Sequence, residues 1–283
     1  MTAAKTSKIF LIALLGLVFA PSAFAAYEIS DGSVKELWHL SDTVDASGNG
    51  HTLINTGGTF TTGKLGNGVS LNGSSQYLNT TITNIGSGDF TITYWVKHNS
   101  FFNYIGHLST TRGTTGFNAG TQAVAQCVWY TNSTEKIRCG TTTYTSGQWH
   151  FVVWKKESGT LKVFVDNVEK GSASDAITYS STNFDLGSSL ANDNSHSEFL
   201  NGILDEVVIA NRAFSTGEIS ALYNAGAGQE ICTTASCAAT TTTSTSTATT
   251  TEEQNNFYSL ATYVLYLVVG LYSFRFGFRM SHI

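Results

Sequence analysis

Asn201–Asn224 reads NGILDEVVIANRAFSTGEISALYN and predicts one strand followed by one helix. Along 202–210, alternation of period two places three large aliphatic side chains on the same face as Asp205. Large aliphatic side chains mark a buried face, so Asp205 is predicted to direct its carboxylate into the interior. A buried carboxylate needs hydrogen-bond donors or a cation, which makes Asp205 a candidate ligand.

The helix in this stretch carries its own start signal. Ser215 and Glu218 fit a capping box, in which each side chain accepts a hydrogen bond from the backbone amide of the other residue. Phe214 and Ile219 occupy the two positions of a hydrophobic staple. The apolar stripe that continues through Leu222 is expected to pack on a sheet.

This strand and helix resemble the closing segment of laminin-G-like jelly rolls in the concanavalin A-like lectin/glucanase superfamily. That segment is written roughly NG-x-x-DEV-x-I and then EI-x-x-LY. The stretches FT-x-x-x-W at 90–95 and WH-x-V at 149–152 carry the same resemblance. The resemblance implies an all-β fold over residues 26–231, a two-sheet antiparallel jelly-roll sandwich with a short C-terminal helix.

The N-terminus has the pattern of a secretory signal peptide. Lys5 and Lys8 precede an apolar run over 9–19, and a small-x-small cleavage site ends at Ala25. Residues 1–25 are therefore predicted to be removed on export, with an uncleaved membrane anchor as the alternative.

The composition changes after the predicted domain. Residues 232–256 are rich in Thr and Ser and predict a stalk, since such a segment cannot build a core. Residues 257–274 carry no charge and are long enough for a transmembrane helix. Arg275 and Arg279 follow, so the short tail 275–283 is predicted to be cytoplasmic. The sequence thus predicts a single-pass membrane protein of the secretory pathway whose N-terminal domain is displayed on the surface.

Charge limits the classes of partner. Residues 26–256 hold 20 acidic side chains and 11 basic ones. This balance argues against nucleic acid, and against binding to anionic lipid headgroups by charge. It is compatible with divalent cations and with neutral sugars.

A loop near the N-terminus has calcium-like spacing. Asp45, Ser47 and Asn49 offer side-chain oxygens at alternate positions before a Gly, as in the first half of a calcium loop, although Thr56 stands where the bidentate Glu is expected. These ligands are too few for calcium alone, so the hypothesis is one structural Ca²⁺ shared with Asp205. Two alternatives stay open: an Asx-turn loop that binds nothing, and an Asp205 that accepts loop amides without a metal.

The four cysteines are predicted to form two disulfides, because exported proteins fold in an oxidising compartment. A hairpin around 131–134 places Cys127 opposite Cys139, and two buried free thiols are the alternative. Cys232 and Cys237 are predicted to close a small loop at the foot of the domain.

The sequence contains no recognisable catalytic constellation. Paired carboxylates of glycan hydrolases have their nearest counterpart at 166–169, which lies in a predicted turn, and the seven histidines show no zinc spacing. Candidate ligand contacts are therefore aromatic rings, on which sugars can stack, and a polar loop over 188–198. The aromatic candidates are Trp129, Tyr130 and Tyr144, with Tyr104 and Phe117 behind them, and the loop candidates are Asp193 and His196. For the aromatic rings, packing in the core is the alternative.

These observations favour a membrane-anchored, surface-displayed and non-catalytic module that binds or adheres to a carbohydrate or a surface protein. A purely structural protein of an envelope or appendage is the alternative, and a glycan-active enzyme is a third interpretation. Exposed aromatic rings would favour the binding module, since a purely structural sandwich has no need of them.

Overall fold

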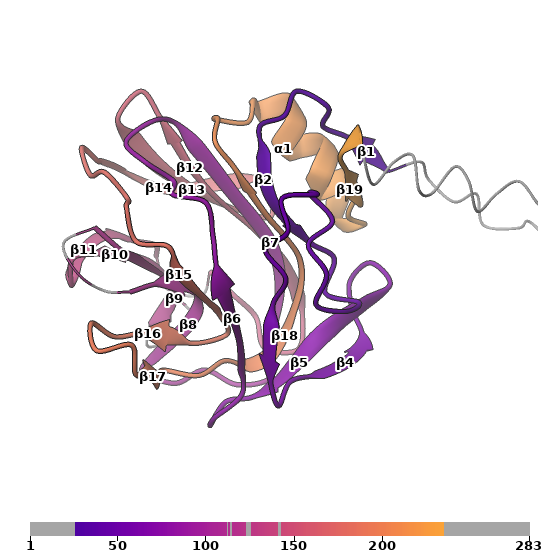
Figure 1. The fold of residues 1–283 in the computed structure, drawn as a ribbon, viewed down its shortest axis with the longest axis vertical. Coiled ribbons are helices and arrows are strands. Elements are labelled where there is room, and N and C mark those ends of the chain that lie inside the picture. Colours follow the sequence, from indigo (N-terminus) through magenta and orange to yellow (C-terminus); the bar gives the residue numbers. More distant parts are fainter. Residues whose placement is uncertain (1–25, 112, 114, 123–125, 141–142, 235–283) are drawn as a thin grey trace, which may run out of the picture.

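The computed structural model describes residues 26–234 except 112, 114, 123–125 and 141–142. Two antiparallel sheets pack face to face as a sandwich, and a short helix lies on the outside of one of them (Figure 1). The predicted all-β jelly-roll sandwich with a short C-terminal helix is therefore confirmed for this part of the chain.

The first sheet has seven strands. In spatial order they are β11 (Thr134–Arg138), β10 (Gln126–Thr131), β9 (Phe117–Gln122), β8 (Tyr104–Thr110), β15 (Asn183–Leu186), β6 (Tyr77–Thr81) and β3 (Ile54–Thr56). Every pairing in this sheet is antiparallel.

The second sheet has eight strands, of which seven form a continuous order. These are β14 (Val168–Ser174), β13 (Thr160–Val165), β12 (Trp149–Glu157), β7 (Phe90–His98), β18 (Asn201–Ala210), β5 (Asn67–Asn72) and β4 (Thr59–Thr62). The eighth, β2 (Val34–Trp38), pairs with the end of β18. β18, which begins the stretch 201–224, is thus a central strand of this sheet.

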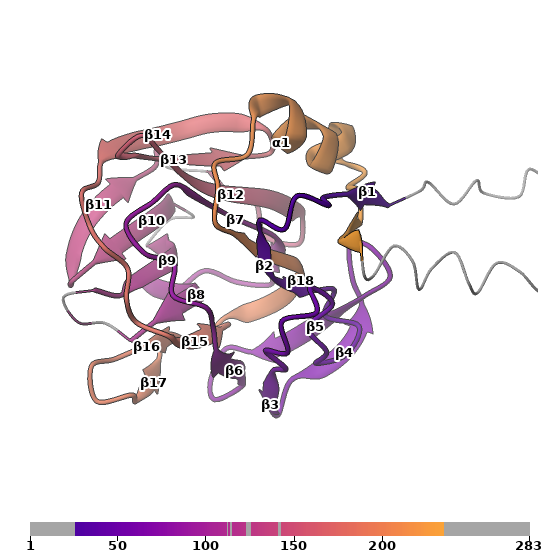
Figure 2. The same cartoon turned by 45° about the horizontal axis from the view of Figure 1, so that its top comes forward.

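Two small pairs complete the fold. Strands β1 (Tyr27–Glu28) and β19 (Ile231–Cys232) pair in parallel, and β16 (Ser189–Leu190) pairs with β17 (His196–Ser197) as a hairpin. Helix α1 (Thr216–Tyr223) is followed by the 3₁₀ turn η1 (Asn224–Gly226). In both views the β1–β19 pair and the β16–β17 hairpin lie on opposite sides of the molecule (Figures 1 and 2).

Alternating side chains divide the eight-stranded sheet between two cores. On β7, Phe90, Ile92, Tyr94 and Val96 enter the main core between the sheets, whereas Trp95 faces the other way, as the sequence predicts. The second core lies under α1, where Ile219, Leu222 and Phe214 pack with Trp95. The central strands of this sheet, β12, β7 and β18, are therefore buried on both faces.

The start of α1 is built as predicted. Ser215 accepts a hydrogen bond from the amide of Glu218, and the Glu218 carboxylate accepts one from the amide of Ser215. Arg212 holds the same carboxylate through two nitrogens, at 2.6 and 3.0 Å, and fixes the link between β18 and α1.

A β-bulge in β18 changes the predicted facing. Glu206 adopts a left-handed conformation with φ of 50°, and the register against β7 shifts between Asp205 and Val208. Val207 and Ile209 therefore face the main core, while Asp205 pairs with Trp95 on the helix-covered face. The prediction that Asp205 shares a face with these aliphatic residues is wrong, because a bulge breaks the period of two.

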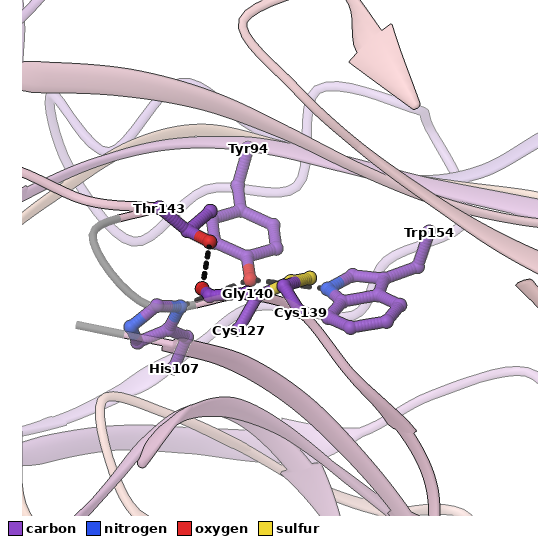
Figure 3. Close-up of a disulfide and its surroundings, with 7 residues drawn as sticks. All are labelled: Tyr94, His107, Cys127, Cys139, Gly140, Thr143 and Trp154. Carbon is purple, nitrogen blue, oxygen red and sulfur yellow. Dashed lines mark hydrogen bonds between the residues drawn. A yellow bond between two sulfur atoms is a disulfide. The ribbon is translucent and has the colours of Figure 1, made fainter. Parts of the chain in front are cut away.

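Cys127 and Cys139 form the predicted disulfide across the β10–β11 hairpin, with 5.1 Å between their Cα atoms. Three side chains from three further strands converge beside it (Figure 3). Tyr94 accepts a hydrogen bond from the indole of Trp154 at 3.3 Å, and its hydroxyl lies 3.0 Å from Nδ1 of His107. The disulfide thus belongs to the main core, which Cys127 and Cys139 both enter.

Several predictions fall on residues outside the described part. The signal peptide 1–25, most of the stalk 232–256, the span 257–274 and the tail 275–283 all lie there. Cys232 is disulfide-bonded, and its predicted partner Cys237 is also outside the described residues. Within the described residues, the structure contains no helix long and apolar enough to cross a membrane.

Candidate functional site

The outer face of the seven-stranded sheet carries a row of polar side chains. Cross-strand partners in an antiparallel sheet point to the same face. The pairings therefore align one side chain from each of six neighbouring strands, β3 to β10: Ile54, Asn79, Asp185, Ser109, Asn118 and Tyr130. All but the first are polar.

The β16–β17 hairpin lies across the middle of this row. The Ser109 hydroxyl donates to the carbonyl of Ser188 at 2.9 Å and accepts from the amide of Leu190 at 2.9 Å. Asn118 donates to the Ser189 hydroxyl at 2.5 Å. Gly106 in β8 permits this approach, because a Cβ there would lie 2.5 Å from the backbone of Ser188. The hairpin separates two depressions on the same face.

The first depression, the tyrosine pocket, has a volume of about 200 Å³ and lies over β8, β9 and β10. Its lining residues are Tyr104, Asn118, Tyr130, Ser133 and Glu198. Tyr104 is 41 % exposed, and its ring centroid lies 6.3 Å from that of Tyr130 at an angle of 59°. Two of the aromatic residues predicted from the sequence therefore come together at the surface.

One amide holds both tyrosine rings. Gln122 donates from its side-chain nitrogen to the Tyr104 hydroxyl at 2.5 Å and accepts from the Tyr130 hydroxyl at 3.1 Å. Tyr130 also lies 3.1 Å from a carboxylate oxygen of Glu135, which Arg138 holds in turn. Burial and these neighbours raise the pKa of the Tyr130 hydroxyl, so it stays protonated. The rings are thereby oriented before any ligand arrives.

The second depression, the histidine pocket, has a volume of about 410 Å³ and lies over β3, β6 and β15. Its lining residues are Ile54, Asn79, Thr80, Thr81, Asn183, Phe184, Asp185, Leu190, Asn194 and His196. His196, one of the loop candidates, therefore lines a pocket. Asp193 lies in the exposed turn of the hairpin, where its carboxylate accepts the hydroxyl and amide of Ser195.

The structure corrects the prediction for two aromatic candidates. Trp129 and Tyr144 belong to the main core, with exposures of 0 % and 3 %. Successive side chains of a strand point to opposite faces, so Trp129 points inward on β10 while its neighbour Tyr130 points outward. Trp129 stacks on Phe117 with 4.4 Å between ring centroids. These rings pack between the sheets and are unavailable to a ligand.

The predicted calcium loop is hydrogen-bonded internally. Oδ1 of Asp45 accepts the amides of Leu37 at 3.2 Å and Ser47 at 2.9 Å, and Oδ2 accepts the amide of His51 at 3.0 Å. The bond to Ser47 closes the Asx turn that the alternative expects. Side chains of Ser47 and Asn49 donate to the carbonyl of Lys35.

Asp45 belongs to a group of side chains with metal-ligand spacing. Glu36, Asp45 and His51 each offer a ligand atom within 4.8 Å of the others. Nδ1 of His51 already lies 2.5 Å from Glu36, whose pKa is raised by burial. Two carboxylates suit Ca²⁺, but the ion would have to replace hydrogen bonds that both already make. Asp205 is not a member of this group, and the shared calcium site stays a prediction.

Asp205 has the hydrogen-bonded environment of the second alternative. Its Oδ2 accepts the amides of Lys64 at 2.6 Å and Leu65 at 2.8 Å, and its Oδ1 accepts that of Glu206 at 2.9 Å. Burial raises the pKa of Asp205 to about 8, although the amide bonds oppose that shift. The carboxylate therefore anchors the loop that follows β4.

Sequence reasoning missed Asp185, Asn118 and Glu198. No local motif marks them, because they meet their partners through strand pairing or hairpin packing. Asn118 could have been found from its outward register opposite Tyr130, had the strand pairing been known.

The sequence model described as the concanavalin A-like lectin/glucanases superfamily matches residues 72–220, more than half of the chain. No curated protein matches the chain.

Solved structures with the same fold include domain 4 of AbnA, an extracellular GH43 arabinanase from Geobacillus stearothermophilus, in complex with arabinotriose. The identity is 18 %, the TM-score 0.53, and the match covers 70 % of this chain and 98 % of that domain. The binding domain of Paraclostridial Mosquitocidal Protein 1 is 15 % identical with a TM-score of 0.56, over 69 % of this chain and 52 % of that one.

A third structure is the botulinum neurotoxin DC binding domain in complex with rat synaptotagmin II. It is 13 % identical with a TM-score of 0.53, and the match covers 68 % of this chain and 51 % of that one. The chain thus spans about half the length of the two toxin binding domains. At these identities the likeness is one of fold.

Proposed function

We propose that this chain, which belongs to the concanavalin A-like lectin/glucanases superfamily, is a non-catalytic module that binds a carbohydrate. The outer face of the seven-stranded sheet takes the ligand, and the tyrosine pocket is the principal contact. The fold alone does not give this function, since one fold carries many activities.

The observation that carries the proposal is the pair of Tyr104 and Tyr130 rings held by Gln122. Sugar rings present faces of C–H groups that pack on aromatic rings, and rigid aromatic side chains give contact area at little cost in conformational entropy. Beside the rings, the polar side chains of Asn118 and Glu198 complete the lining of the pocket. An aromatic platform next to a polar wall suits a neutral sugar.

Two further observations support binding rather than hydrolysis. Among the described residues that line each pocket there is one carboxylate, Glu198 in one and Asp185 in the other. Most glycoside hydrolases place two carboxyl groups across the scissile bond. The fold neighbours include a domain solved with arabinotriose and two toxin binding domains.

The module is displayed on a membrane-anchored stalk in this proposal. The predicted anchor follows the domain, and the described chain leaves next to the β1–β19 pair, on the side opposite to the β16–β17 hairpin (Figures 1 and 2). Such a tether would leave the outer sheet face directed away from the membrane. External protease on intact cells should release the 26–231 domain; protection of this domain while a C-terminal tag is removed would contradict the orientation.

A glycan array tests the carbohydrate. The full chain, purified in detergent, is compared with Tyr104→Ala and Tyr130→Ala. Phe102→Ala is the matched control, because Phe102 is 52 % exposed and two residues from Tyr104 but does not line the pocket. We expect the wild type and the control to retain the same glycans and both tyrosine variants to lose them. A wild type that retains no glycan would leave the purely structural alternative.

A further inference from the structure

We infer that the histidine pocket is a second subsite for the same ligand, in which Nε2 of His196 accepts a hydrogen bond from a sugar hydroxyl. Its distance from the tyrosine pocket further implies that the ligand is an oligosaccharide chain rather than a single sugar. The inference rests on the proposed function, because it assigns a second contact to the carbohydrate proposed there.

A buried carboxylate sets the hydrogen-bond polarity of His196. Nδ1 of His196 lies 2.5 Å from Oδ2 of Asp185, which also accepts the Ser188 hydroxyl at 2.5 Å. Asp185 is fully enclosed, and a carboxylate oxygen with these neighbours is an acceptor. The proton of the neutral imidazole is therefore assigned to Nδ1, which leaves Nε2 with a free lone pair.

The ring is also fixed in orientation. Tyr77 stacks on His196 with 3.8 Å between centroids and an angle of 21°. The position of the His196 ring is thus set by Asp185 at the ring edge and by Tyr77 at the ring face. A group held in this way loses little entropy when it binds a ligand.

Nε2 of His196 is left for an outside partner. No described residue makes a hydrogen bond to it, while the side chain keeps 23 % of its surface exposed and lines the pocket. Asn194, also in the lining, has its side-chain oxygen occupied by Thr111 and Asn183. Its side-chain nitrogen Nδ2 makes no hydrogen bond to any described residue and can donate. The pocket thus offers an acceptor beside a donor, which matches a hydroxyl group.

The hairpin does not need this histidine ring for attachment alone. It is already tied to β8 and β9 through Ser109 and Asn118. His51 shows the same type of pair, with Nδ1 at 2.5 Å from the buried Glu36 and 26 % side-chain exposure, but it lines neither of the two pockets. His51 is therefore a matched control for a histidine that pairs with a buried carboxylate outside the two pockets.

The two pockets are separated by a fixed number of strands. From Asp185 to Tyr130 the polar row takes three steps, through Ser109 and Asn118. At 4.7–4.9 Å per strand this is about 14 Å, which exceeds one sugar ring. A ligand that reaches both pockets has to be a chain that passes over the hairpin.

Titration calorimetry on the full chain tests the subsite. The probes are arabino-oligosaccharides and cello-oligosaccharides, each from monosaccharide to hexasaccharide, with wild type, His196→Ala, Asp185→Asn, His51→Ala and Tyr130→Ala. We expect His196→Ala to weaken the longest bound oligomer about tenfold, as for one lost hydrogen bond, with little change for the shortest. Asp185→Asn should weaken the same oligomers with the imidazole still present, and His51→Ala should change none.

The outcomes separate the two proposals. Equal affinity of wild type and His196→Ala at every length, with binding lost in Tyr130→Ala, would overturn the subsite and leave the proposed function standing. A loss of the same size at every length, shared by His51→Ala, would show a structural effect and also overturn the subsite. A wild type that binds none of these oligomers would contradict both proposals for this ligand class.

Discussion

Nε2 of His98 lies 2.7 Å from Nε2 of His107, and the hydrogen bond between them joins the two sheets inside the main core. The donor and acceptor of each hydrogen bond that leads to this pair can be assigned. Trp154 donates to the Tyr94 oxygen, and Nδ1 of His107 is the acceptor that the described residues offer to the Tyr94 hydroxyl proton. With Tyr94 donating to Nδ1, His107 carries its proton on Nε2 and donates to His98. The proton of His98 is left on Nδ1, which has no partner among the described residues.

This pair predicts an acid-sensitive core. Burial lowers the pKa of His107 to about 3 and that of His98 well below 6.5, and His107 and His150 add to the shift of His98. The unfolded state therefore binds more protons below pH 6.5, and each histidine contributes stability that is lost at about 1.4 kcal/mol per pH unit as the pH falls.

We expect His98→Gln, whose amide oxygen can still accept from His107, to reduce that slope by the contribution of one histidine. The measurement is urea unfolding between pH 7.5 and 4.5, and the difference between the two curves cancels groups common to both proteins. Parallel curves would show that His98 does not titrate on unfolding.

The disulfide predicts a large and specific loss of stability. Cys127 and Cys139 close a loop with a sequence separation of 12, and replacing both with Ala should cost about 3 kcal/mol in the chain-entropy model. For a domain of this size the melting temperature should fall by about 6–12 °C. Peptide mapping without reduction should recover the two linked. Recovery of both as alkylated thiols would contradict the assignment.

The position of Gly63 leaves no room for a side chain between Asp205 and the loop after β4. A Cβ on Gly63 would lie 2.5 Å from Oδ2 of Asp205 and 2.7 Å from backbone atoms of Asn67 and Gly68 at the start of β5. Gly63→Ala should therefore destabilise the domain by about 1–3 kcal/mol, as overpacking does. Gly88→Ala is the control, since nothing lies within 4 Å of its Cβ position. Equal melting temperatures of the two variants would mean that the loop yields without cost.

Calcium is tested by melting with and without chelator. An ion bound only by the folded state adds about 2.7 kcal/mol at a hundredfold excess over its dissociation constant. The melting temperature should then rise by about 5–10 °C. If the ion sits with Glu36, Asp45 and His51, Asp45→Ala removes the increase and Asp205→Asn keeps it. Identical melting in calcium and in EGTA would remove the metal and leave the hydrogen-bonded loop.

The tyrosine pocket predicts that the ring of Tyr130, rather than its hydroxyl, provides most of the affinity for carbohydrate. Tyr130→Ala removes the platform and should weaken carbohydrate binding by about tenfold or more, as loss of an aromatic anchor does. Tyr130→Phe keeps the ring and loses only the bonds to Gln122 and Glu135, so most of the affinity should remain. Equal losses in the two variants would assign the contact to the hydroxyl instead.

Local signals in the sequence correctly predicted the features that depend only on residues close together in the chain. The capping box of Ser215 and Glu218 needs only residues three apart, and the Cys127–Cys139 pair needs only one hairpin. Both are confirmed because few other parts of the chain take part in them.

The rest depended on contacts that periodicity does not contain. A single left-handed residue, Glu206, moved Asp205 to the other face of its strand. On β10, neighbours Trp129 and Tyr130 have similar chemistry but opposite facing, which only the strand register decides. The partnership of His196 with Asp185 arises where a hairpin folds back over a sheet, and its spacing matches no motif.

The parallel pairing of Tyr27 with Ile231 brings both ends of the domain to one corner. Two backbone hydrogen bonds, from Tyr27 to Glu230 and from Ile29 to Cys232, close that corner. A pull applied between the two ends is therefore borne first by this short pair and only afterwards by either sheet. The domain can therefore be inserted into a longer chain that enters and leaves it at the same corner. The same adjacency allows its two ends to be joined and new termini to be opened elsewhere, as in a circular permutant.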